Sequence, residues 1–129
     1  WPRIPDIVRW HHERADGSGY PDGLMMEDVA MPVRIVALAD TFDAMTSERP
    51  YREPMSVGST ISEIVRLSPQ KYDPNAVQAL VVQLRRDAVG SNRTPFLTHP
   101  SALNIAPADL DQLAAGLQHR VSRGKLYLT

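Results

Sequence analysis

The 129-residue sequence contains no cysteine and no long hydrophobic run. Without cysteine it can form neither a disulfide framework nor a thiolate-ligated metal site, and this composition fits a reducing cytoplasm. Because no stretch reaches about 18 apolar residues, we expect no membrane insertion by this chain. The opening Trp1-Pro2-Arg3 has neither an initiator methionine nor a basic leader, so we expect a fragment of a longer protein.

The sequence also lacks an excess of charge of either sign. Fourteen Lys and Arg residues face fifteen Asp and Glu residues, which leaves a formal net charge of -1. This balance argues against a nucleic acid polymer as a partner, so any anion must bind at a local site. An apolar content of 43% suits one globular domain with a modest core.

Apolar spacing and helix start signals predict an all-α fold. Ser56 and the pair Asp73-Pro74 are typical first-turn residues, and Gly124 is a typical helix end. The last helix is amphipathic and needs either the domain's own bundle or a partner to cover it. Residues 87–106 are polar and proline-punctuated, which indicates a linker, and residues 125–129 could add a short strand. The expected helices cover about residues 5–15, 32–46, 57–68, 74–86 and 110–124.

Two adjacent histidines follow the apolar positions of the first expected helix. Ile4, Ile7 and Val8 are spaced i, i+3 and i+4, so His11 at i+7 continues their stripe, and His12 lies about 100° around the helix. Both rings can then face one cavity. A histidine pair by itself is more often a hydrogen-bonded core or surface group than a ligand.

Asp40 lies in an apolar stripe of the second expected helix. A carboxylate buried there without a partner would cost several kcal/mol, which predicts a cation beside it. A metal ion is the first candidate, and Arg34 or Arg49 are the alternatives. Imidazole nitrogen and carboxylate oxygen together suit iron, manganese or zinc.

Two further segments carry side chains suited to a nucleotide. Residues 16–31 contain Gly17, Gly19, Gly23 and Pro21, which predicts an irregular loop in which Tyr20 offers a stacking face, although such loops are also common as plain surface turns. Arg49 and Arg52 can hold a phosphate in bidentate fashion. Alternatively, neighbouring carboxylates neutralise both arginines as surface ion pairs. Those carboxylates are Asp43, Glu48 and Glu53.

Four motifs now appear in a fixed order: His-His-Glu at 11–13, Asp-Gly-Ser-Gly-Tyr-Pro at 16–21, Ala-Asp-Thr-Phe-Asp-Ala-Met-Thr-Ser at 39–47 and Arg-Pro-Tyr-Arg at 49–52. In order and spacing they resemble the second half of the HD-GYP domain family. The resemblance runs from about Trp10 to Val77. It divides the chain into residues 1–86, the C-terminal half of such a domain, and residues 87–129, a linker plus an amphipathic helix without assignment.

The resemblance implies a partial HD-type helical bundle that hydrolyses the bacterial second messenger cyclic di-GMP with two or three divalent ions, iron or manganese. It implies signalling partners such as diguanylate cyclase (GGDEF) domains, and the uncovered faces of a partial bundle predict a homo-oligomer. The implied metal ligands are His11, His12 and Asp40, and the implied substrate contacts are Gly19, Tyr20, Pro21, Arg49 and Arg52.

Two acidic residues beside these positions have open roles. Glu13 either orients a histidine ring or faces solvent at the helix end. Asp43 lies one turn after Asp40 and can accept a hydrogen bond from a ligand or from Arg49.

The sequence also departs from the family pattern. The family's His-Asp pair and its other ligands precede the region matched here, so the resemblance implies an incomplete ligand set and a chain that is inactive alone. Met26 stands where the family usually has glycine, and Ala30 where it usually has proline. These changes keep an alternative open, a catalytically degenerate module that binds signalling partners through its Gly-Tyr-Pro loop.

Overall fold

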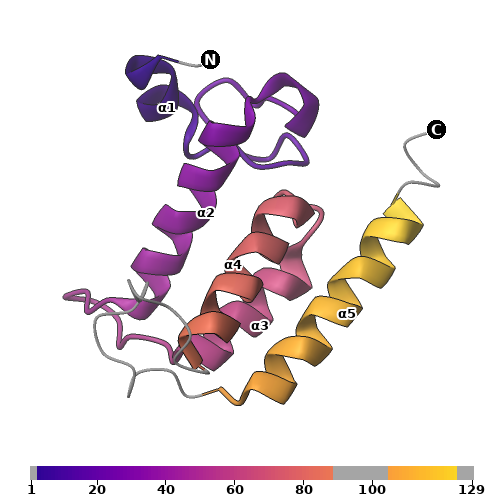
Figure 1. Ribbon diagram of the computed structural model, residues 1–129. Helices are drawn as coiled ribbons and strands as arrows, with labels where there is room; N and C mark the ends of the chain where they lie inside the picture. Colours follow the sequence, from indigo (N-terminus) through magenta and orange to yellow (C-terminus); the bar gives the residue numbers. More distant parts are fainter. Residues whose placement is uncertain (1–2, 89–104, 125–129) are drawn as a thin grey trace.

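The computed structural model describes residues 3–88 and 105–124, and within these ranges it contains α-helices, one 3-10 turn and no strand. This confirms the all-α expectation. The expected linker and terminal strand fall mostly on residues 89–104 and 125–129, which lie outside the described residues. The helices, labelled in Figure 1, are α1 (Ile4–Trp10), α2 (Met31–Thr46), α3 (Val57–Leu67), α4 (Pro74–Ala88) and α5 (Pro107–Gly124), and the 3-10 turn is η1 (Met26–Asp28).

The predicted helix starts of α3 and α4 are confirmed. The Ser56 hydroxyl accepts a hydrogen bond from the Ser59 amide at 3.1 Å and so caps α3. The Asp73 carboxylate accepts from the amides of Asn75 at 2.7 Å and Ala76 at 3.3 Å and so caps α4, directly before Pro74. Both caps satisfy amides that have no partner within their own helix.

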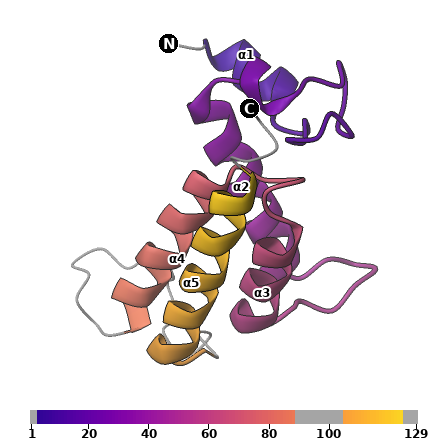
Figure 2. The same cartoon turned by 90° about the vertical axis from the view of Figure 1, so that its right-hand side faces the viewer.

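The hydrophobic core lies between α3, α4 and α5, with the second half of α2 along one side. In Figure 2, α5 lies in front of α3 and α4, and α5 packs against both. Leu110 and Leu117 of α5 are fully buried in the same cluster as Ile61, Ile64 and Leu84. Of the two alternatives for covering the last helix, the domain's own bundle and a partner, the structure shows the bundle.

The first helix is shorter than predicted, and its apolar stripe is not buried. It ends at Trp10, His11 is its C-cap, and α1 has no buried residue. Ile4 and Val8 are 76% and 63% exposed. His11 and His12 form a turn after the helix, and the buried Glu13 already contacts the loop that follows. His11 thus reaches its place as an end-of-helix residue, not as part of an inward stripe.

The expectation that Asp40 is buried is also wrong. The buried side chains of α2 are Val33, Ala37, Leu38 and Phe42, whereas Asp40 itself is exposed. Positions 33, 37, 38 and 42 form the inward face, and position 40 lies at its edge. The desolvation argument for a cation therefore does not apply to Asp40. The case for Asp40 as a metal ligand therefore depends on the residues beside it, His11 and His12.

Apolar side chains remain exposed along α1 and α2. Ile35 lies in a shallow apolar groove of about 270 Å³ that Leu38 and Leu80 also line, between α2 and α4. No helix among the described residues is both long and apolar enough to cross a membrane.

We predict that α5 unfolds together with the rest of the bundle. Leu117→Ala removes a fully buried side chain, so the free energy of unfolding should fall by about 2–5 kcal/mol, as measured by urea denaturation followed by circular dichroism. Val82→Ala, at a half-exposed site on α4, is the control and should cost under about 1 kcal/mol. Equal stability of Leu117→Ala and the unaltered protein would contradict this arrangement.

Candidate metal centre

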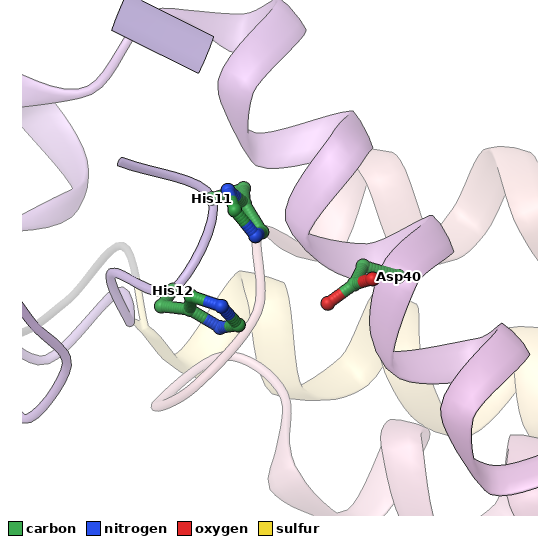
Figure 3. A group of neighbouring side chains, drawn as sticks. All are labelled: His11, His12 and Asp40. Carbon is green, nitrogen blue, oxygen red and sulfur yellow. The ribbon is translucent and has the colours of Figure 1, made fainter. Parts of the chain in front are cut away.

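Three metal-binding side chains converge beside the middle of α2. His11 and His12 come from the chain just after α1, and Asp40 comes from α2 (Figure 3). One ligand atom from each residue lies within 4.8 Å of the other two. Asp40 is exposed and both histidines are half-buried, so the group borders solvent and an ion can reach it.

The spacing of these atoms suits one or two divalent ions. Two ligands on one ion, each about 2.1 Å from it, lie about 3–4.2 Å apart. Three ligands on one ion lie at most about 3.6 Å from one another, so these atoms, which lie within 4.8 Å, must approach by up to about 1 Å to share one ion, or can flank a pair of ions. Two imidazole nitrogens and a carboxylate oxygen are a donor set for manganese, iron or zinc. The residues present thus fit a divalent metal.

A backbone contact selects the nitrogen with which His11 can bind a metal. Its Nδ1 lies 2.7 Å from the carbonyl oxygen of Val8. A carbonyl can only accept a hydrogen bond, so Nδ1 carries the proton and Nε2 of the neutral ring keeps its lone pair. Metal-bound histidines commonly use their second nitrogen in this way.

The glycine-rich loop packs directly against the histidine backbone. A Cβ on Gly19 would lie 2.4 Å from the carbonyl oxygen of His12 and 2.4 Å from the amide nitrogen of Arg14, so only glycine fits there. The next residue, Tyr20, donates its amide hydrogen to the His12 carbonyl at 3.3 Å. Its ring stacks on the His12 ring with centroids 4.8 Å apart and planes 19° apart. The Gly-Tyr-Pro segment, which ends at Pro21, therefore lies beside the metal group.

Glu13 is buried, and the described hydrogen bonds of its carboxylate go to the loop. It is 4% exposed, so it does not face solvent. Its carboxylate accepts hydrogen bonds from the amides of Asp22 at 2.7 Å, Gly23 at 3.1 Å and Leu24 at 2.9 Å. The described hydrogen bonds thus join Glu13 to the loop and not to a histidine ring, because the loop folds back over it.

Sequence reasoning missed a clamp between the loop and α1. Asp22 accepts hydrogen bonds from Arg9 Nε at 2.9 Å and Nη2 at 2.8 Å, and from Trp10 Nε1 at 2.8 Å. The Arg9 bonds, followed by the Trp10 bond, lower the pKa of the Asp22 carboxyl. Asp22-Gly23 is a turn signal, but nothing in it indicates partners more than ten residues earlier.

A second missed contact ties the start of the loop to the turn before α4. Lys71 Nζ lies 3.0 Å from a carboxylate oxygen of Asp16 and 2.6 Å from the Ser18 hydroxyl. The Ser18 hydroxyl, then Lys71 and the Ser18 amide, donate hydrogen bonds that lower the pKa of Asp16 to about 2. The loop is thus held to the bundle as well as to α1.

The end of the loop is joined to the bundle by Arg34. Its guanidinium pairs with Asp73 at 2.7 Å and donates to the carbonyls of Val29 and Met26, each at 2.6 Å. Arg34 therefore does not pair with Asp40, the alternative that the sequence left open. Met26 begins η1 and Ala30 caps α2 with extended backbone, so the two departures from the family pattern lie at this junction.

The expected phosphate-binding arginines lie beyond the other end of α2. Arg49 Nη2 is 3.8 Å from Asp43 Oδ2, and both side chains are well exposed. Asp43 also accepts from the Ser47 hydroxyl at 3.1 Å. Arg52 donates to the carbonyl of Ala44 at 2.7 Å, near the C-terminus of α2. The structure thus contains the Arg49–Asp43 surface pair, which an incoming anion can open at small cost.

Comparison with known proteins identifies relatives of this chain. A model of the HD domain family matches residues 2–76. The cyclic di-GMP phosphodiesterase response regulator RpfG of Xanthomonas campestris is 46% identical over 75 residues, which cover 58% of this chain and 20% of that protein. No solved structure matches the chain.

Two relatives from Vibrio cholerae extend the comparison. A probable cyclic di-GMP phosphodiesterase is 38% identical over 111 residues, 86% of this chain and 24% of that protein. The 3'3'-cGAMP-specific phosphodiesterase 1 is 52% identical over 59 residues, 43% of this chain and 14% of that protein. The chain therefore spans no more than about a quarter of the length of these relatives.

We predict that the stabilising effect of Asp16 depends on pH. Its folded pKa is lowered to about 2, so its contribution is complete above the unfolded pKa of about 3.9 and is lost as the pH falls towards 2. Because the side chain is 35% exposed, screening limits that contribution to about 1 kcal/mol. Urea denaturation should show Asp16→Asn less stable than the unaltered protein at pH 6.

At pH 3 the difference between the two proteins should be smaller. Glu53→Gln, at an exposed site, serves as the control and should show little difference at pH 6. A difference between Asp16→Asn and the unaltered protein that grows on acidification would show that the Lys71 contact does not hold the charged form.

Proposed function

The chain belongs to the HD domain family, and on this basis we propose that it forms part of the catalytic domain of a metal-dependent phosphodiesterase that hydrolyses cyclic di-GMP. The observation that carries the proposal is the convergence of His11, His12 and Asp40 beside a Gly-Tyr-Pro loop. The names of the relatives support a cyclic dinucleotide substrate, cyclic di-GMP in most cases and 3'3'-cGAMP in others. Both substrates contain guanine and two phosphodiester groups.

Each residue of the site would have a separate role. His11, through Nε2, together with His12 and Asp40 would hold the divalent ions, iron or manganese. When bound, these ions supply Lewis-acid activation of water and of the phosphodiester. Tyr20 is 62% exposed and offers the ring face that does not contact His12 to a guanine base.

Phosphate recognition falls to arginine in this proposal. The guanidinium of Arg49 is accessible, and its weak pair with Asp43 can be exchanged for phosphoryl oxygens as charge develops there. Arg52 keeps the neighbouring turn in place through its bond to Ala44 and contributes a second positive charge. Gly19 and Pro21 would shape the backbone on which Tyr20 approaches the substrate.

Three protein ligands do not complete a site for two or three ions. Two ions in octahedral or five-coordinate geometry share more protein ligands than two imidazoles and one carboxylate. We therefore propose that these 129 residues bind metal weakly and hydrolyse cyclic di-GMP only within a longer protein that supplies the other half of the domain.

We predict that the chain binds Mn²⁺ through the three named residues. Isothermal titration calorimetry should show that His12→Ala and Asp40→Asn each weaken binding at least tenfold, because each removes one of three ligands. His119→Ala, at an exposed site on α5, is the matched control and should leave the affinity unchanged. Equal affinities for all four proteins would rule out this site.

We also predict a difference in turnover between the short and the long protein. With Mn²⁺ or Fe²⁺ added, residues 1–129 should not linearise cyclic di-GMP, whereas a longer protein that includes the His-Asp helix of the domain should do so. Chromatography of the nucleotide products measures both. Robust turnover by residues 1–129 would contradict the ligand argument.

The same longer protein separates the enzyme from a binding module. The exposed ring of Tyr20 also favours a partner surface on this loop, for which a diguanylate cyclase (GGDEF) domain is the proposed partner. Metal binding together with hydrolysis supports the enzyme. Capture of the cyclase domain by metal-free protein that never hydrolyses cyclic di-GMP supports the module instead.

A further inference from the structure

Two sets of hydrogen bonds join the loop to His12 and Glu13. The Glu13 carboxylate holds the amides of Asp22, Gly23 and Leu24, while the Tyr20 amide donates to the carbonyl of His12, the residue directly before Glu13. The chain between Tyr20 and Asp22 connects these two sets of hydrogen bonds. The loop therefore holds the backbone on both sides of the His12–Glu13 peptide bond, once at the His12 carbonyl and once at the Glu13 side chain.

These hydrogen bonds also bring the Tyr20 ring against His12, a candidate metal ligand. The Tyr20 ring stacks on the His12 ring, and the two histidine rings lie 4.0 Å apart between centroids. Gly19 allows this approach because a Cβ there would overlap the backbone of residues 12–14. A displaced loop would therefore withdraw the ring that packs against His12.

A buried carboxylate is well suited to hold the loop, because it can accept several hydrogen bonds and donates none. A glutamine at this position has nearly the same shape, but its amide nitrogen is a donor. One of the loop amides would then face another donor and lose its partner in a site that water does not reach freely.

We propose that Glu13 is the positioning residue of the histidine pair. It binds no metal itself, but its carboxylate fixes the loop so that Tyr20 packs on His12 and keeps that ring aimed at the site. The metal part of this inference rests on the proposed function, whereas the ring part concerns the metal-free protein. Loosening Glu13 should therefore change both His12 geometry and metal affinity without removing a ligand.

The test compares Glu13→Gln with Glu63→Gln in the 129-residue chain. Glu63 pairs with Arg66 on the surface of α3, far in sequence from the loop, and makes a matched control. The first readout is the nuclear Overhauser contact between the ring protons of His12 and Tyr20 without metal. The second is Mn²⁺ affinity, which outer-shell changes typically lower by about 10–100-fold.

We expect Glu13→Gln to lose the contact between the two rings and to bind Mn²⁺ at least tenfold more weakly, with the helical circular dichroism of the unaltered protein. Glu63→Gln should keep both the ring contact and the Mn²⁺ affinity of the unaltered protein. A retained ring contact in folded Glu13→Gln overturns the proposal, whatever the affinity. If the unaltered protein binds no Mn²⁺, the proposed function fails, and the ring contact still decides the role of Glu13. If Glu13→Gln does not fold, Tyr20→Ala replaces it, and unchanged histidine ring signals would then overturn the coupling.

Discussion

The site depends on one buried carboxylate. Glu13 accepts hydrogen bonds from the amides of three consecutive loop residues and so holds the middle of the loop over the histidine segment. Three hydrogen bonds to a charged acceptor, each contributing about 1.5–3 kcal/mol, can hold an irregular segment that has little apolar surface of its own. Arg9 and Lys71 hold the two ends of the same loop by ion pairs with Asp22 and Asp16.

The site is connected to the bundle through α2. Arg34 joins the loop carbonyls of Met26 and Val29 to Asp73, which at the same time caps α4. The core that supports α4 includes Leu110 and Leu117 of α5, which lie beyond the part of the chain that the family model matches. The position of Asp40 relative to the histidines is thus set by a bundle in which the last helix takes part.

Tyr20 is common to both proposed functions, the enzyme and the binding module. One ring belongs at once to the exposed loop and to the surroundings of His12, so a molecule that engages the loop also acts on the candidate metal ligand. Such linkage is reciprocal in binding free energy: a partner that changes metal affinity has its own affinity changed by metal by the same factor. An enzyme and a regulated module can therefore use the same residues.

The sequence by itself determined the all-α fold, the starts of α3 and α4 and, through the order of the family motifs, the three candidate metal ligands, because apolar periodicity, Ser56, Asp73-Pro74 and the spacing of the motifs are all local signals. Only the tertiary structure decided that α1 ends at Trp10, that Asp40 is exposed and that Glu13 faces the loop. These features depend on contacts between residues far apart in sequence. Arg9 with Asp22 and Lys71 with Asp16 are such contacts, and no local pattern encodes them, because hydrogen-bond partners are chosen only when the chain has folded.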